Sequence, residues 1–243
     1  MGVLENQVAV VTGAGTGIGR AVAETFAREG ASVALLGRRR EPLREVAAPF
    51  PRDRVLTCAC DVSSRARVAE VFARVRERLG VVNLLVNNAG INTVVRDLAR
   101  IEPSDWDHVL AVNLTGAFNC IRAVLPGMRE LGGGVIINVS SIAGKRASKV
   151  AGVAYVASKH GMVGLTHATN VEEGVHGIRS TVISPGEVDT PILDVRPEPV
   201  PREKRKRILR SEDVAACALL AAGLPPRACV PEIVIAPAIK SYA

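Results

Sequence analysis

Tyr155 and Lys159 lie four positions apart and form the pair best suited to proton transfer in this sequence. In a helix, this spacing places both side chains on one face, one turn apart. A phenol has an unperturbed pKa of about 10, and a nearby cation lowers that pKa because it favours the phenolate. The pair therefore predicts a general acid and base, although Tyr-x-x-x-Lys alone is a common helical coincidence.

Two further polar positions have plausible chemical roles. Ser140 and Ser141 directly follow a predicted strand at 135–139. Open α/β sheets bind their ligands at the carboxyl ends of the strands, so a hydroxyl there can hydrogen-bond a substrate oxygen on which charge develops. Asn113 lies within a helical stretch, where asparagine has a low propensity, which suggests a task for its amide. The alternative for Asn113 is an ordinary surface position.

A glycine-rich segment, TGAGTGIGR at 12–20, follows the first predicted strand and leads into a helical pattern. Glycines permit a sharp turn and let backbone N–H groups approach a pyrophosphate at the positive end of the helix. This position between the first strand and the first helix favours dinucleotide binding over a turn without a ligand. The candidate contacts are Gly13, Thr16, Gly17, Ile18 and Gly19.

The end of the second predicted strand distinguishes between the two nicotinamide cofactors. An acidic residue there would bind the adenosine ribose hydroxyls and repel a 2′-phosphate. This chain has Gly37, followed by Arg38, Arg39 and Arg40. Guanidinium groups match phosphate oxygens, so the segment favours NADP(H) over NAD(H), with Arg38 as the first candidate and Arg39 beside it. The alternative is a solvated basic turn whose arginines pair with glutamates along the next helix.

Short β-branched runs alternate with longer segments of helical periodicity, which is typical of a parallel sheet with crossover helices. Their near-continuous hydrophobicity suits strands that are covered on both faces. We therefore predict a doubly wound α/β fold with seven parallel strands in a single domain, 1–243. The predicted strands are 8–11, 33–36, 55–59, 84–86, 135–139, 180–183 and 233–235. The predicted helices are 18–28, 41–47, 65–79, 105–128, 156–173 and 212–222, with Ser63 or Ser64 capping the third.

Composition excludes several classes of protein. The 243 residues are 48% hydrophobic and 23% charged, as expected for one globular domain. The net charge of +7 allows phosphate-bearing partners, but 3% aromatic residues and no groove-reading motif argue against nucleic acid. We find no signal-peptide pattern, and the most apolar stretch, 214–224, is shorter than the roughly 20 residues that a bilayer needs. A cytoplasmic protein without a membrane span is expected.

The cysteines and histidines show no metal-ligand spacing. The five cysteines are odd in number, lack a C-x-x-C pair and lie mostly in apolar runs, so we expect reduced, buried thiols and no metal site. His160 and His167 could share one face of the helix that carries Tyr155, but packing or surface roles are favoured for both.

The glycine spacing Gly13-x-x-x-Gly17-x-Gly19 differs from the common G-x-G-x-x-G and resembles that of the short-chain dehydrogenases/reductases. The resemblance covers essentially the whole chain through Asn87-Asn88-Ala89-Gly90, Asp61-Val62, Asn113, the Ser-Ser-x-x-Gly run, Tyr-x-x-x-Lys and Pro185-Gly186. It implies a Rossmann-type fold and a nicotinamide-dependent oxidoreductase, acting on a small-molecule carbonyl or alcohol.

The resemblance also implies roles for the catalytic residues. The family's serine lies three before the glycine, which selects Ser141 to polarise the substrate oxygen. Tyr155 would transfer the proton, and Lys159 would lower the Tyr155 pKa and hold the nicotinamide ribose. Asn113 would support a water that links the lysine to solvent. The 14-residue interval from Ser141 to Tyr155 is one longer than is usual in the family, and the loop 145–154 is expected to absorb it.

Cofactor contacts follow from the same resemblance. Asp61 would contact the adenine edge with Val62 beside it, while Val188 would hold the carboxamide and Thr190 would touch the phosphates. The other expected cofactor contacts are Asn88, Ala89, Gly90, Tyr155, Lys159, Pro185 and Gly186.

A Pro-rich basic segment, 194–210, interrupts the alternation of strands and helices where the family carries its substrate lid, about 190–210. Long insertions in compact domains are usually functional or mobile. The basic residues 204–207 are either a solvated helix end or a site for an acidic partner, such as a carrier protein or a phosphorylated substrate.

Together these features predict an NADP(H)-dependent reductase that converts a ketone, such as a 3-oxoacyl thioester or another aliphatic ketone, to a secondary alcohol. Two alternatives stay open: an NAD(H)-linked alcohol dehydrogenase working oxidatively, and a catalytically silent NADP(H)-binding sensor or scaffold. The resemblance further implies a homotetramer or homodimer packed through the helices 105–128 and 156–173.

Overall fold

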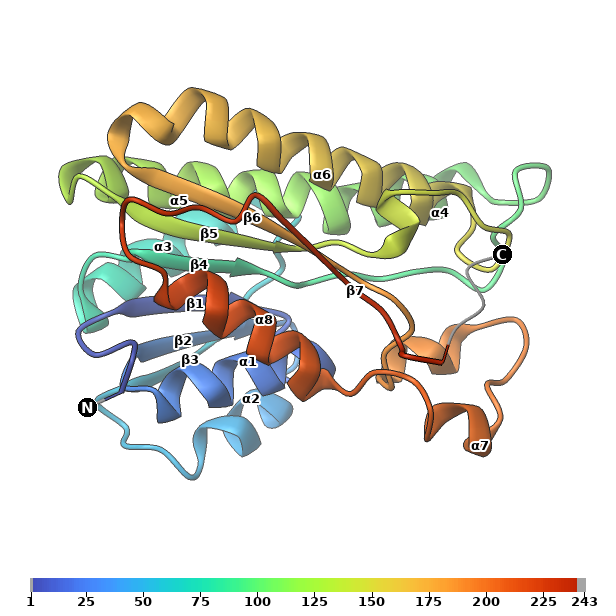
Figure 1. The fold of residues 1–243 in the computed structure, drawn as a ribbon, viewed down its shortest axis with the longest axis horizontal. Coiled ribbons are helices and arrows are strands. Elements are labelled where there is room, and N and C mark those ends of the chain that lie inside the picture. The colour runs from blue at the N-terminus through green and yellow to red at the C-terminus, as the bar shows by residue number, and fades with distance from the viewer. Residues whose placement is uncertain (1, 240–243) are drawn as a thin grey trace.

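The computed structural model describes residues 2–239, in which seven parallel strands form one sheet in the order β3-β2-β1-β4-β5-β6-β7 (Figure 1). The strands are β1 Val8–Thr12, β2 Ser32–Gly37, β3 Val55–Ala59, β4 Leu84–Asn87, β5 Gly134–Val139, β6 Ile178–Pro185 and β7 Glu232–Ile235. All seven predicted strands are present. Most of their predicted ends are within one residue of the observed ones, whereas β6 is two residues longer at each end.

Helices cover both faces of the sheet, as predicted (Figure 1). One face carries α1 Gly17–Arg28, α2 Arg40–Ala47 and α8 Ser211–Gly223. The other carries α3 Arg65–Leu79, α4 Pro103–Leu110, α5 Gly116–Glu130 and α6 Val153–Glu173. The Ser64 hydroxyl caps α3 by accepting from the Arg67 N–H, which decides between the two predicted caps.

Two hydrophobic layers explain the near-continuous apolar strands. Successive side chains of a strand point to opposite faces of its sheet. In β1, Ala9 and Val11 pack in the layer that contains Phe26 of α1, while Val10 packs in the layer that contains Phe72 of α3. All five side chains are buried, so neither face of this strand needs polar residues.

The predicted helix 105–128 is longer and irregular. The helical stretch runs over Pro103–Glu130, and a π-helical turn, Ala111–Thr115, separates α4 from α5. By length and composition alone, the stretch is long and apolar enough to cross a membrane. Sequence hydrophobicity pointed only to 214–224 as the most apolar run. It packs against α3, α6 and the sheet, so the protein core accounts for its apolar face.

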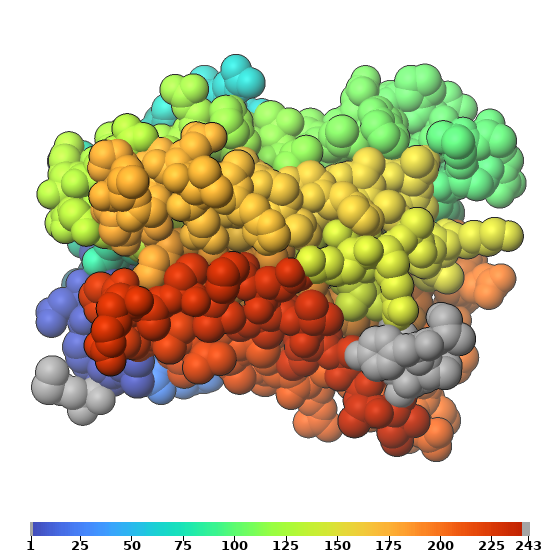
Figure 2. All heavy atoms as spheres, turned by 45° about the horizontal axis from the view of Figure 1, so that its top comes forward, coloured from blue at the N-terminus to red at the C-terminus, as the bar shows by residue number. Residues whose placement is uncertain are grey.

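Helix α6 begins three residues earlier than predicted, because Gly152 precedes it with φ +79° and turns the chain into the helix. Tyr155 therefore lies in the first turn. In the space-filling view, α6 runs along the surface beside the C-terminal part of the chain (Figure 2). Val171 on this helix is 81% exposed. Packing of copies through α6 stays a prediction.

The thiols and imidazoles differ from one another in burial. Cys58, Cys60 and Cys120 are buried, as expected, whereas Cys229 is exposed, which corrects the prediction for that residue. Cys229 lies in the loop between α8 and β7, where sequence hydrophobicity does not report burial. His160 and His167 are both exposed on α6.

A buried polar ladder joins three strands to α6. The Asn87 amide donates to Asn138 Oδ1 (2.9 Å), and the Asn138 amide donates to Thr166 Oγ1 (2.9 Å) and Ser180 Oγ (3.4 Å). These residues are fully or almost fully buried, so each lost bond leaves a polar atom without water.

Replacing Asn138 tests this ladder. Asn138→Leu should lower the free energy of unfolding by about 1–3 kcal/mol, because it strands the Asn87 and Thr166 groups. The matched control, Ile136→Val, removes one methyl group two residues away and should cost about 0.5–1.5 kcal/mol. Urea denaturation measures both, and a stable Asn138→Leu would contradict the stabilising role of the ladder.

Candidate active site

The predicted site residues gather at the carboxyl edge of the sheet. β1 pairs with β2 on one side and β4 on the other, so the chain connections diverge there and open a crevice at the strand ends. The segments after β4, β5 and β6 all project from this edge (Figure 1). The fold thus brings the glycine-rich segment, the Ser-Ser pair and the Pro-Gly segment to one place.

Thr12 and Asn88 hold the glycine-rich segment against β4. The Thr12 hydroxyl accepts from the N–H groups of Asn88 (2.9 Å) and Ala89 (3.0 Å). The Asn88 side-chain amide donates to the carbonyls of Thr12 (3.0 Å) and Gly13 (3.3 Å). The Asn88 side chain therefore binds the backbone of the glycine-rich segment and supports it.

Close backbone approach explains the glycine at position 19. A Cβ on Gly19 would lie 2.3 Å from the Gly13 carbonyl oxygen and 2.4 Å from Asn88 Nδ2, which no side chain tolerates. Gly17 has φ +53°, and a Cβ there would meet Thr190 at 3.0 Å. The start of α1 thus packs on the Pro-Gly segment, with Thr190 beside Gly17. The contact of Thr190 with the cofactor phosphates stays a prediction.

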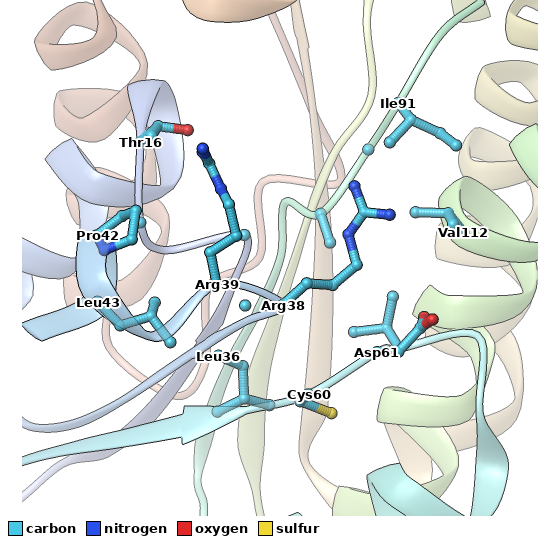
Figure 3. A pocket seen from close by; sticks show the side chains of 16 residues that line it. Thr16, Leu36, Arg38, Arg39, Pro42, Leu43, Cys60, Asp61, Ile91 and Val112 are labelled. Atoms are coloured by element: carbon cyan, nitrogen blue, oxygen red, sulfur yellow. The ribbon is translucent and has the colours of Figure 1, made fainter.

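A cleft with about 710 Å³ of open space runs between this segment and the ends of β2, β3 and β4 (Figure 3). Eight predicted cofactor contacts line it: Gly13, Thr16, Arg38, Arg39, Asp61, Val62, Ala89 and Gly90. Gly15 of the glycine-rich segment and Gly37 at the end of β2 also line it. The sequence did not indicate the rest of the lining, namely Leu36, Pro42, Leu43, Cys60, Ile91 and Val112. Pocket-wall side chains carry no motif, so their signal is absent from one sequence.

Arg38 and Arg39 extend along the cleft in different directions. Figure 3 shows Arg39 reaching toward Thr16 and Arg38 reaching toward Val112 and Asp61. Arg44 pairs with Glu41 at 3.0 Å, as the solvated-turn alternative expected for that helix. Within residues 2–239, neither Arg38 nor Arg39 forms an ion pair at contact distance, and both are exposed.

Asp61 stays ionised beside these arginines. The Ser63 hydroxyl donates to its carboxylate at 2.7 Å, and the Ser63 N–H does so at 3.0 Å. These bonds, with the weaker attraction of the Arg38 charge, hold the Asp61 pKa below its usual value against the effect of partial burial.

The Ser141 hydroxyl lies close enough to the Tyr155 phenol to lower its pKa, whereas Ser140 faces away. The Ser140 hydroxyl is buried and donates to the Lys159 carbonyl at 3.0 Å. The Ser141 hydroxyl also accepts from the Ala143 N–H at 3.1 Å, which fixes its position. The geometry therefore selects the same serine as the resemblance.

The electrostatics of Tyr155 differ from the expectation. Burial raises its pKa, while the Ser141 hydroxyl and the positive charges of Arg96 and Arg196 act in the opposite direction. The expected lowering by Lys159 is absent. The Lys159 ammonium does not point to the Tyr155 hydroxyl. It donates to the Val139 carbonyl at 2.8 Å and lies 5.5 Å from the centre of the Tyr155 ring.

Lys159 is itself perturbed. Its side chain is buried, and burial lowers its pKa to about 8. At neutral pH the ammonium therefore persists, held by a main-chain carbonyl rather than by a carboxylate.

Asn113 is completely buried, so the surface alternative is wrong. Its amide oxygen accepts from the Ile91 N–H at 2.8 Å, and its nitrogen donates to the Ile91 carbonyl and to Ser158 Oγ, both at 3.0 Å. It lies in the π-helical turn, a distortion that often marks functional positions. A Cβ on Gly90 would lie 3.5 Å from Asn113 Oδ1 and 3.6 Å from Lys159 Nζ, so this glycine keeps the space between them open.

Arg96 is an important residue that the sequence did not reveal. It is 6% exposed, and its guanidinium donates to the carbonyls of Thr93 (2.6 Å), Val150 (2.6 Å) and Val195 (2.8 Å). It thus ties the segment after β4 to the loop before α6 and to the lid. A lone arginine carries no sequence signal for such contacts.

The Pro-Gly segment closes the far end of the site. The Gly186 N–H donates to the Ile235 carbonyl at 2.7 Å, directly after Pro185 ends β6. Val188 forms an isolated parallel bridge with Leu209, which closes the lid segment at its base. Ten predicted cofactor contacts lie outside the lining of the cleft in Figure 3: Gly17, Ile18, Gly19, Asn88, Tyr155, Lys159, Pro185, Gly186, Val188 and Thr190.

Metal ligands do not cluster in this site. Across residues 2–239, no three His, Cys, Asp or Glu side chains are grouped so that they could hold an ion.

Comparison with known proteins agrees with this geometry. The family model described as short chain dehydrogenase matches residues 7–200. The chain belongs to the short-chain dehydrogenase/reductase family. It is 40% identical over 196 residues to a 3beta-hydroxysteroid dehydrogenase from Mediterraneibacter gnavus, covering 80% of this chain and 70% of that protein.

Solved short-chain dehydrogenase/reductase structures share the whole fold. A metagenomic short-chain oxidoreductase in complex with NADP is 33% identical with a TM-score of 0.82, covering 98% of this chain and 100% of that one. A serine dehydrogenase complexed with NADP+ is 28% identical with a TM-score of 0.89, covering 98% and 97%. The predicted Rossmann-type fold in a single domain is therefore confirmed.

Gly19 provides a test of the glycine-rich segment. Gly19→Ala should weaken NADPH binding at least about tenfold, because the new Cβ displaces Gly13 from the backbone path that faces the cleft. Gly164→Ala on α6 is the control, since a Cβ there meets nothing within 4 Å and should leave binding unchanged. Fluorescence titration measures both, and equal affinities in the two variants would contradict this role.

Proposed function

We propose that this member of the family is an NADP(H)-dependent reductase that converts a ketone to a secondary alcohol. The observation that carries the proposal is the placement of the Ser141 hydroxyl next to the Tyr155 phenol, beside a cleft into which Arg38 and Arg39 project. A general acid and an oxygen-binding hydroxyl next to a dinucleotide cleft are the parts that carbonyl reduction needs.

The residues of the cleft fit a phosphorylated dinucleotide. The backbones of Gly13 and Gly19 approach each other closely, and no side chain covers them where a pyrophosphate would meet the start of α1. Arg38 and Arg39 would hold a 2′-phosphate, and Asp61 with Val62 would border the adenine. The other expected contacts, from Asn88 to Thr190, either support this segment or close the far end of the site. When bound, the cofactor supplies the hydride that a carbonyl carbon accepts.

The chain's own residues complete the reaction by handling the proton. Burial raises the Tyr155 pKa further above neutral, so the phenol is protonated and its hydroxyl can donate to the substrate oxygen as that oxygen gains charge. Ser141 would hydrogen-bond the same oxygen. Lys159 would hold the nicotinamide ribose and return a proton to Tyr155 after the reaction. Asn113 would support the polar route by which the lysine regains a proton from solvent.

Apolar side chains around the entrance support an aliphatic substrate. Val94, Leu98 and Val150 are 60%, 79% and 54% exposed, on the two segments that Arg96 ties together. Exposed apolar groups beside a site favour the binding of apolar ligand surface. An aliphatic ketone or a 3-oxoacyl compound suits this rim.

Three of the basic residues at 204–207 pair with acids in the lid or just before it, and of these Lys204 pairs with Glu187. Lys206 pairs with Glu203 at 2.7 Å, and Arg205 pairs with Asp189 at 3.2 Å and with Asp194. These ion pairs favour a lid that is stabilised by its own contacts over a docking site for an acidic carrier protein.

Tyr155→Phe tests the proposed reaction. Loss of the proton donor should lower kcat/KM for ketone reduction by roughly 10²–10⁴ while NADPH affinity changes little, because the ring stays in place. NADPH consumption across a panel of aliphatic ketones and 3-oxoacyl thioesters measures turnover. Turnover that survives in the variant, or a wild type that binds NADPH but reduces no carbonyl, would contradict the proposal and favour a sensor.

Arg38→Ala tests the cofactor preference. Its loss should weaken NADPH binding about tenfold or more and leave NADH binding nearly unchanged, because a charge-assisted bond to the 2′-phosphate is lost. Arg44→Ala is the control, since its guanidinium binds Glu41. A wild type that binds NADH more tightly, or equal weakening for both cofactors, would favour the oxidative NAD(H) alternative.

A further inference from the structure

Two guanidinium groups lie near the first turn of α6, which carries Tyr155. The Arg96 backbone carbonyl accepts from the Val153 N–H at 3.1 Å, and its guanidinium donates to the carbonyl of Val195, the residue before Arg196. The positive charges of both arginines act to lower the Tyr155 pKa. Arg96 comes from the segment after β4 and Arg196 from the lid. Both are largely shielded, with 6% of Arg96 and 17% of the Arg196 side chain exposed.

Within residues 2–239, Arg96 has no carboxylate partner at contact distance. All three of its acceptors are main-chain carbonyls, of Thr93, Val150 and Val195. Carbonyl dipoles satisfy three of its five N–H groups but do not neutralise the charge. A buried charge without a counter-ion is costly, and an incoming anion would relieve that cost.

Arg196 shares its one carboxylate with a second cation. Its Nη1 atom lies 2.8 Å from Glu187 Oε1, and Lys204 Nζ lies 3.1 Å from each oxygen of the same carboxylate. Arg196 and Lys204 therefore share the Glu187 carboxylate, while Arg96 is held by main-chain carbonyls alone. Because Lys204 by itself can keep the Glu187 carboxylate paired, the Arg196 guanidinium can leave Glu187 and bind a ligand.

We propose that the substrate carries a carboxylate within a few bonds of its reacting carbonyl, and that Arg196 binds this carboxylate with Arg96 as a fixed positive charge behind it. The proposal rests on the proposed carbonyl reduction and names its substrate class, short aliphatic oxo acids. A guanidinium matches a carboxylate through two parallel hydrogen bonds, and the apolar rim would take the aliphatic remainder. The competing explanation is that the Arg196–Glu187 pair only braces the lid.

Matched acids and esters separate these explanations. We would measure NADPH-dependent kcat/KM for 3-oxobutanoate, 4-oxopentanoate and 2-oxohexanoate, each against its ethyl ester, together with neutral aliphatic ketones. The wild type should favour at least one acid over its ester by about tenfold or more, chiefly through KM. Arg196→Gln should bring that ratio close to one, and Arg196→Lys should restore part of it.

Arg202→Gln is the matched control, because it removes an equal charge from an exposed lid position and should leave the ratio unchanged. Should Arg196→Gln fail to fold, inhibition of the wild type by hexanoate against hexanamide serves instead: the acid should bind at least about tenfold more tightly.

Each result has a distinct meaning. Esters or neutral ketones reduced as well as every acid would overturn the oxo-acid proposal and leave the reductase intact. An acid preference that persists in Arg196→Gln would overturn the role of Arg196. NADPH binding without reduction of any acid, ester or ketone would overturn the reductase and this inference together.

Discussion

The buried amide of Asn113 forms paired hydrogen bonds with the main chain of Ile91 and a third with Ser158, and the rest of the site depends on this contact. It joins the segment after β4, the π-helical turn and α6. Ser158 in turn donates to the Tyr155 carbonyl at 2.8 Å, so the same contact fixes the turn that carries Tyr155 and Lys159. Without the Asn113 hydrogen bonds, the wall of the cleft at Ile91 and the helix turn of Tyr155 would not be held in fixed positions relative to each other.

A cation-rich interior is the second property of the site. Lys159 and Arg96 are buried and held by main-chain carbonyls, and Arg196 shares its acid with Lys204. Such an interior favours negative charge, which carbonyl reduction places on the substrate oxygen and which an oxo acid also carries. The raised pKa of Tyr155 and the lowered pKa of Lys159 both follow from exclusion of water.

The sequence predicted those features that local chemistry encodes. Apolar runs gave the strands, and the glycine-rich segment and the Tyr-x-x-x-Lys pair led to the cleft and the catalytic helix. The π-helical turn was not predictable, because it depends on a distant partner, Ile91. Arg96 was missed for the same reason: its acceptors Val150 and Val195 are far away in sequence. The oligomeric state, tetramer or dimer, stays a prediction.

The most direct test of the account is isotope transfer in a single turnover. Protein loaded with NADPH that carries deuterium at both C4 positions of the nicotinamide would be mixed with 3-oxobutanoate, and the product analysed by mass spectrometry and NMR. The account predicts one deuterium on the carbinol carbon of 3-hydroxybutanoate in the wild type and none in Tyr155→Phe on the same timescale. Bound NADPH that keeps its label with 3-oxobutanoate and with every other carbonyl offered would contradict it.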